Sequence, residues 1–153
     1  MKLTAKADIA APIDLAFEGL RDPDRLEQTV RARGGSIRRN PAGPMTKGTQ
    51  WDARIAFRGA SRHVNFIVTR LDAPKAMRFQ GNGAAFDITV DVELAVVGAS
   101  TTRLTVTTQG EPRTLPARIM MQSLKLAHGQ MLARYRAQVV DYVAELESDL
   151  RLS

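Results

Sequence analysis

The chain has 153 residues, of which 44% are hydrophobic and 25% charged. This composition is typical of an ordinary globular protein and predicts one domain over residues 1–153. The absence of cysteine excludes a disulfide framework, thiol catalysis and a thiolate metal site. No apolar run is long enough to cross a membrane, and a strand that begins at residue 2 leaves no room for a targeting segment. We therefore expect a cytoplasmic protein with no stable membrane insertion.

The net charge of +6 raises the question of nucleic-acid binding. We interpret the positive charge as spread over the chain and interleaved with acids. A cluster forms only at Arg31, Arg33, Arg38 and Arg39, and no aromatic side chains alternate with these arginines to stack on bases. We therefore expect no nucleic-acid partner.

The beginning of the chain predicts a strand followed by two short helices. Residues 2–9 alternate small apolar and polar side chains, as a half-buried strand does. Pro12 is well placed to open a helix. Asp22 is a predicted N-cap with Pro23 at the first helical position, so a second short helix is expected through Thr29.

Six more strands are expected before residue 112. They are predicted at residues 33–39, at 48–57, around 64–68, around 77–79, at 85–97 and around 104–106. Short turns join most of them, which indicates an antiparallel meander. The alternation is clearest in 85–97, where the inward parity holds Phe86, Ile88, Val90, Val92, Leu94 and Val96. The acids Asp87, Asp91 and Glu93 take the other parity, and we interpret them as a solvated sheet face and not as a metal site or an acid/base set.

Residues 112–147 predict one long amphipathic helix. An interior proline removes a hydrogen bond, so Pro116 is the position where a break in this helix is expected, if there is one. Its apolar side chains recur at intervals of three and four residues, at Met120, Leu124, Ala127, Met131, Tyr135, Val139, Tyr142 and Leu146. Seven strands span roughly 30 Å, whereas a helix with its side chains is about 10–12 Å wide. The sheet must therefore curl around the helix, and the space beside the helix is either filled by side chains or left hollow.

These elements resemble the helix-grip fold of the START/Bet v 1-like (SRPBCC) superfamily. The resemblance rests on a strand followed by APIDLAFEGLRDPDRLEQ, on KGTQWDARI after the loop, and on the long final helix. By this resemblance the fold class is α+β, with a seven-stranded curved antiparallel sheet wrapped around a long C-terminal helix and two short helices after the first strand. The nearest group is that of bacterial polyketide cyclase/dehydrase and lipid-transport-like proteins.

The resemblance implies a hydrophobic ligand and leaves its chemistry open. Members of the superfamily bind lipids, sterols, polyketides or aromatic compounds, and some cyclise or hydroxylate them. The Rieske-type oxygenases among them need an iron site of histidines and a carboxylate. This chain has only His63 and His128, without the spacing of such a site. No metal and no cofactor are therefore expected.

The predicted ligand site lies between the sheet and the last helix, and we assign no catalytic residue. Its predicted lining is Trp51, Ile55, Phe57, Phe66, Phe79, Phe86, Ile88, Met120, Leu124, His128, Met131 and Tyr135. His128 is either a catalytic imidazole or a hydrogen-bonded histidine at the edge of the apolar face. Tyr135 either offers its hydroxyl to a ligand or belongs to the core. His63 is interpreted as a solvated surface residue.

Three functions remain open from the sequence. The first is binding of a hydrophobic small molecule or lipid in the cavity. The second is a cyclase/dehydratase-type enzyme acting on a polyketide-like or aromatic substrate, with His128 as acid or base. The third is an interaction protein that docks an acidic partner on the arginines of residues 31–39. A homodimer is also left open.

Overall fold

The computed structural model describes residues 1–57 and 59–152, except for the side chains of Phe57 and Leu152. Within these residues the chain forms seven strands and four helices. The strands are β1 (Lys2–Ile9), β2 (Ser36–Asn40), β3 (Gln50–Phe57), β4 (Ala60–Asp72), β5 (Ala76–Gly83), β6 (Phe86–Gly98) and β7 (Thr101–Pro112). The helices are α1 (Ile13–Leu20), α2 (Pro23–Ala32), α3 (Leu115–Leu126) and α4 (His128–Leu152).

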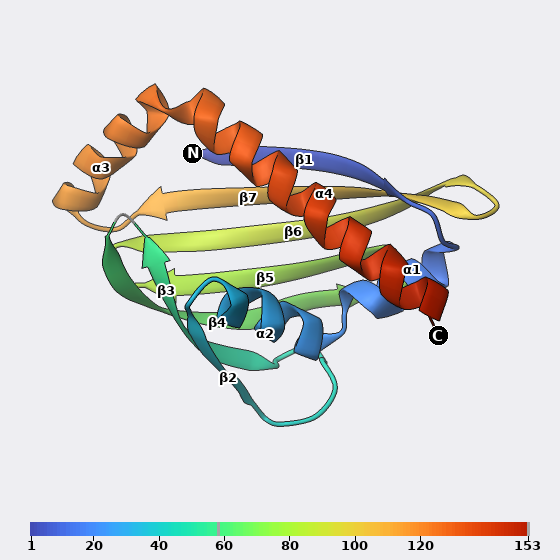
Figure 1. Ribbon diagram of the computed structural model, residues 1–153. Helices are drawn as coiled ribbons and strands as arrows, with labels where there is room; N and C mark the ends of the chain where they lie inside the picture. The colour runs from blue at the N-terminus through green and yellow to red at the C-terminus, as the bar shows by residue number, and fades with distance from the viewer. Residues whose placement is uncertain (58, 153) are drawn as a thin grey trace.

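The strands form one antiparallel sheet in the order β1-β7-β6-β5-β4-β3-β2. Strands β2 to β7 follow one another as a meander, and β1 completes the sheet by pairing with β7. The sheet curves, and α4 runs diagonally across its concave side, with α1 and α2 on the same side (Figure 1). The predicted helix-grip α+β fold is therefore confirmed.

Local sequence explains where the helices begin. The Asp22 carboxylate accepts a hydrogen bond from the backbone N–H of Asp24 at 3.0 Å, and Pro23 occupies the first turn. Thr114 caps α3 in the same way, because its hydroxyl accepts from the N–H of Ala117 at 3.2 Å. Both caps satisfy donors that the first turn of a helix leaves unpaired.

The C-terminal region differs from the single helix predicted over 112–147. Strand β7 continues to Pro112, and two helices follow, which meet at Ala127. Pro116 does not break a helix, because it lies in the first turn of α3, where its missing N–H costs no hydrogen bond. The consequence is that α4 alone grips the sheet, while α3 projects beyond the sheet end (Figure 1).

The alternation predicted for β6 is correct over most of its length. Val92 and Leu94 are buried, whereas Val96 is 65% exposed, so its predicted inward placement is wrong. Val96 lies next to the β6–β7 turn, where the hairpin extends beyond the helices (Figure 1). None of the four described helices covers that part of the hairpin (Figure 1).

The buried core is concentrated at the end of the sheet where α1 packs against α4. Its largest buried side chains include Ile9, Phe17, Leu104 and Leu146. A smaller cluster, around Met45, Trp51 and Val68, lies under α2. Leu71 and Phe79 pack against both clusters and connect them. Among the described residues no helix is apolar enough over its length to cross a membrane.

Two helical glycines provide a matched test of this packing. A Cβ at Gly19 would overlap Cδ1 of the fully buried Leu146, whereas a Cβ at Gly129 would meet nothing within 4 Å. We predict that Gly19→Ala lowers the free energy of unfolding by about 1 kcal/mol, because overpacking of about 1–3 kcal/mol exceeds the gain in helix propensity. Gly129→Ala should instead raise it by about 0.5–1 kcal/mol. Urea denaturation measures both changes, and a stabilising Gly19→Ala would contradict the close α1–α4 packing.

Candidate functional site

A cavity of about 380 Å³, here called the main cavity, lies between the sheet, α2 and α4. Its walls are mainly aliphatic and aromatic. They include Trp51, Ala53, Ile55, Phe66, Met77, Phe79, Val90, Val92, Leu104 and Val106 from the sheet. Helix α2 adds Leu26 and Val30, and α4 adds Val139. The volume lies at the lower end of the range of small-molecule pockets.

A few polar groups interrupt this apolar lining. The hydroxyls of Tyr135 and Thr108 lie 2.9 Å apart and share a hydrogen bond. The hydroxyl of Tyr142 is buried and has no hydrogen-bond partner among the described residues. Desolvation raises the pKa of Tyr135, and burial raises the pKa of Tyr142 further still. Both phenols therefore remain protonated near neutral pH and can donate a hydrogen bond to a ligand.

Beyond the main cavity the concave side opens toward α3. A second hollow of about 590 Å³, here called the α3 hollow, is lined by strand residues and by Met121, Leu124 and Met131 of the last two helices. Ile55 and Thr108 border both the main cavity and the α3 hollow. The two spaces are thus neighbours along the inner face of α4.

The structure divides the predicted lining between these two spaces. The main cavity contains Trp51, Ile55, Phe66, Phe79 and Tyr135, and the α3 hollow contains Ile55, Phe86, Ile88, Leu124 and Met131. Met120 and His128 border neither space, and the side chain of Phe57 lies outside the described part of the structure. His128 is half-buried at the first position of α4, where the helices meet. The predicted role of His128 in the cavity therefore has no support in this geometry.

The sequence-based prediction missed the contribution of α2 and much of α4. Leu26, Thr29, Val30 and Arg33 all face the main cavity from or beside α2. Helix α2 is short, and the order of apolar and polar residues along it did not indicate which of its faces is buried. Tyr142 could have been found, because it shares the apolar face of α4 with Tyr135 at a spacing of seven residues.

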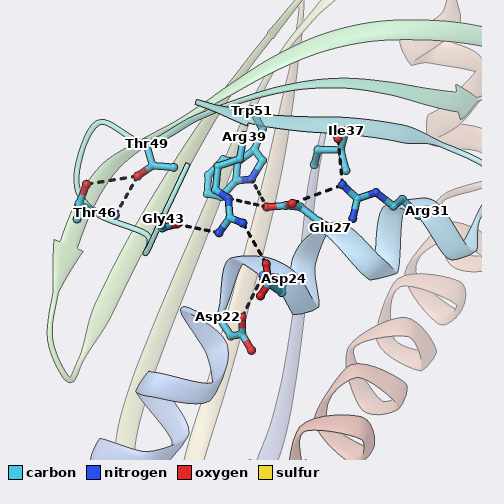
Figure 2. A network of polar contacts seen from close by, with 10 residues as sticks. All are labelled: Asp22, Asp24, Glu27, Arg31, Ile37, Arg39, Gly43, Thr46, Thr49 and Trp51. Carbon is cyan, nitrogen blue, oxygen red and sulfur yellow. Dashed lines mark hydrogen bonds and ion pairs between the residues drawn. The ribbon is translucent and has the colours of Figure 1, made fainter. Parts of the chain in front are cut away.

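A buried carboxylate fastens α2 to the wall of the main cavity (Figure 2). Glu27 is 5% exposed and accepts a hydrogen bond from the indole N–H of Trp51 at 3.1 Å. Its carboxylate also pairs with Arg39 of β2 at 3.1 Å and with Arg31 at 3.5 Å. Arg39 in turn reaches Asp24 at 3.0 Å and the carbonyl of Gly43 at 2.8 Å. We call these residues the Glu27 network.

The Glu27 network determines the orientation of an aromatic wall. The Trp51 indole N–H donates a hydrogen bond to Glu27. The Trp51 ring also contacts the ring of Phe79, and the two ring centroids are 6.1 Å apart. Both rings line the main cavity. A buried charge is tolerated only when paired, so this arrangement also restrains where α2 can lie.

The outward acids of β6 take part in surface ion pairs. Asp87 pairs with Arg113 and Asp91 pairs with Arg78. Among the residues that the structure describes, no three His, Asp or Glu side chains are grouped so as to hold a metal ion. The interpretation of these acids as a solvated face agrees with their positions.

The chain matches no protein-family model and no curated protein. Solved structures, however, resemble it over almost its whole length. The Zhui aromatase/cyclase from Streptomyces sp. R1128 has a TM-score of 0.71 at 13% identity, with coverage of 98% of this chain and 95% of that chain. Ara h 8.0201 has a TM-score of 0.60 at 13% identity, and the alignment covers 100% of this chain and 99% of Ara h 8.0201.

DynU16, from the dynemicin biosynthetic locus, is 22% identical with a TM-score of 0.58. The alignment covers 98% of this chain but 47% of DynU16, so the chain spans about half the length of that protein. At these identities the likeness is one of fold. The likeness agrees with the predicted helix-grip fold.

Removal of the Glu27 carboxylate should be costly. We predict that Glu27→Ala lowers the free energy of unfolding by about 3 kcal/mol, because it leaves the Arg39 guanidinium and the Trp51 N–H without their buried partner. Glu18→Ala is the control, since Glu18 forms an exposed ion pair with Arg21, and it should change stability by less than about 1 kcal/mol. Chemical denaturation with tryptophan fluorescence measures both; similar effects for the two variants would show that the network does not hold α2.

Proposed function

We propose that the protein binds a hydrophobic small molecule, such as a lipid or an aromatic compound, in the main cavity. The observation that carries this proposal is the coincidence of an apolar hollow with a buried tyrosine hydroxyl that has no partner among the described residues. Burial of apolar ligand surface would supply about 25 cal/mol per Å². The hydroxyls of Tyr142 and Tyr135 would orient one polar group of the ligand.

A cyclase remains the second candidate, because one of the similar structures is an aromatase/cyclase. The cavity chemistry supports binding more strongly. Its described polar lining consists of hydroxyls, the Gln138 amide and the Arg33 guanidinium, without a carboxylate or an imidazole. The phenols are not available as bases near neutral pH, because burial raises their pKa values and keeps them protonated. Cyclisation here would have to rely on placement of the substrate and on hydrogen-bond donation.

The structure gives less support to docking of an acidic partner by the arginine cluster. Arg31 and Arg39 are engaged in the Glu27 network. Arg33 and Arg38 are exposed, and Arg33 also borders the main cavity. Two exposed arginines outside the network are a weak basis for electrostatic recognition of a protein surface.

Filling the main cavity should abolish binding. Ala53 is buried on the cavity wall, and Ala53→Phe places a ring in the space that a ligand would occupy. We expect the fluorescent probe N-phenyl-1-naphthylamine to bind the natural chain at about one molecule per protein, and to bind the variant at least about tenfold more weakly. Titration by fluorescence measures both.

Two further variants make this result interpretable. Val106→Phe fills the same space from β7, in case Ala53→Phe does not fold, and Ala95→Phe adds the same ring on the exposed side of β6 as a matched control. Binding of the probe should be lost in Val106→Phe and retained in Ala95→Phe. A natural chain that does not bind the probe, or cavity variants that bind it normally, would contradict the proposal.

The two tyrosines should respond in opposite ways. We predict that Tyr142→Phe raises the free energy of unfolding by about 1 kcal/mol, because it removes a buried hydroxyl that has no partner, whereas Tyr135→Phe lowers it by a similar amount through loss of the bond to Thr108. Thermal denaturation without ligand measures this difference. If Tyr142→Phe destabilises the protein, then the hydroxyl is already satisfied and is not free for a ligand.

A further inference from the structure

Helix α3 carries an apolar stripe that faces solvent. Its members are Leu115, Ile119 and Leu126, which are 70%, 61% and 91% exposed. At about 100° per residue, these three side chains fall within about 40° of one another around the helix. They extend over about 17 Å along the axis. We call this surface the α3 stripe.

The α3 stripe is distinct from the face by which α3 packs on the protein. Ala117, Met121 and Leu124 are buried, and they lie on the opposite side of the helix. Met121 and Leu124 line the α3 hollow. Helix α3 is therefore apolar on two sides, and the second side has no partner among the described residues. Large exposed aliphatic side chains in one stripe usually mark a contact surface.

The charge around the α3 stripe indicates what it contacts. Residues 112–140 contain five Lys and Arg and no Asp or Glu, whereas the remaining 124 residues carry 17 basic and 16 acidic side chains. Five of the six net positive charges therefore belong to this segment, although most basic side chains are spread over the rest of the chain among acids, as we expected from the sequence. Arg118 and Lys125 lie on α3 itself, next to the stripe, and neither forms an ion pair with the described residues.

A second copy of the chain fits this surface poorly. Three aliphatic side chains cannot supply the roughly 800 Å² per partner that a stable protein interface uses. A symmetric contact would also bring Arg118 and Lys125 of both copies together. The phosphates of a nucleic acid would attract Arg118 and Lys125, but a nucleic acid would leave the aliphatic α3 stripe exposed to water.

We propose that α3 docks on the surface of an anionic lipid membrane. The α3 stripe enters the boundary between headgroups and acyl chains, and Arg118 and Lys125 contact anionic headgroups. The helix lies along the surface and does not cross it, since α3 spans only 12 residues. Its opposite face borders the α3 hollow, so in the docked state α3 lies between that hollow and the lipid. The docking itself does not depend on whether the main cavity is occupied.

Co-sedimentation with lipid vesicles tests the proposal. We expect the natural chain to bind vesicles of 70% phosphatidylcholine and 30% phosphatidylglycerol at least about tenfold more tightly than pure phosphatidylcholine at low salt, and to bind less as salt rises. The variant Leu115→Gln/Ile119→Gln/Leu126→Gln should lose at least about tenfold in affinity. Arg118→Glu/Lys125→Glu should lose the preference for anionic lipid.

The matched control moves the same change elsewhere. Leu15, Val96 and Val97 are also exposed aliphatic residues, so Leu15→Gln/Val96→Gln/Val97→Gln should bind vesicles like the natural chain. The proposal is overturned if the natural chain does not sediment with anionic vesicles, or if the α3 stripe variant binds them undiminished, which would show attraction by charge alone. It is also overturned if analytical ultracentrifugation shows self-association that the stripe variant abolishes. Probe binding in the main cavity should persist in the stripe variant, which separates this result from the ligand proposal.

Discussion

The structure depends on a mismatch in width between one sheet and one helix. Seven strands must bury their concave face, and α4 is too narrow to cover it alone. Curvature brings the edges of the sheet toward α4 but leaves a space between α4 and the middle of the sheet. One core cluster, with Leu146 and Phe17, fills the end near α1, and the other, with Trp51 and Val68, lies under α2. The main cavity borders both clusters, through Met77 and Leu104 of the first and Trp51 of the second.

Helix α2 completes the enclosure, and its position depends on charge as much as on packing. Glu27 is a buried acid in the second turn of a short helix, and it links α2 to Arg39 on β2 and to Trp51 on β3. This pairing compensates the cost of removing the carboxylate from water. It also holds the indole as a rigid wall. The same residues that secure the helix therefore shape the space available to a ligand.

The antiparallel meander and the helix-grip arrangement could be predicted from the sequence, because alternation in β3 to β7 and the cap at Asp22 are local signals. The pairing of β1 with β7 could not, since it joins residues about a hundred positions apart. The break between α3 and α4 could not, since the apolar spacing continues through Ala127 without interruption. Of the candidate site, the inward-facing Trp51, Phe66 and Phe79 follow from strand parity. The role of Glu27 depends on Arg39 and Trp51, which are 12 and 24 residues away, so no local pattern reveals it.

Together the observations describe a hydrophobic hollow with few polar groups, which leads past Ile55 and Thr108 toward a basic helix with an exposed apolar stripe. The central claim is that the main cavity is a dry, accessible space. Diffraction from crystals of the protein pressurised with xenon tests this most directly, because apolar cavities that exclude water take up xenon. The account predicts a xenon atom between Phe79, Val106 and Val139. An interior with no xenon, filled by side chains or by ordered water, would contradict it.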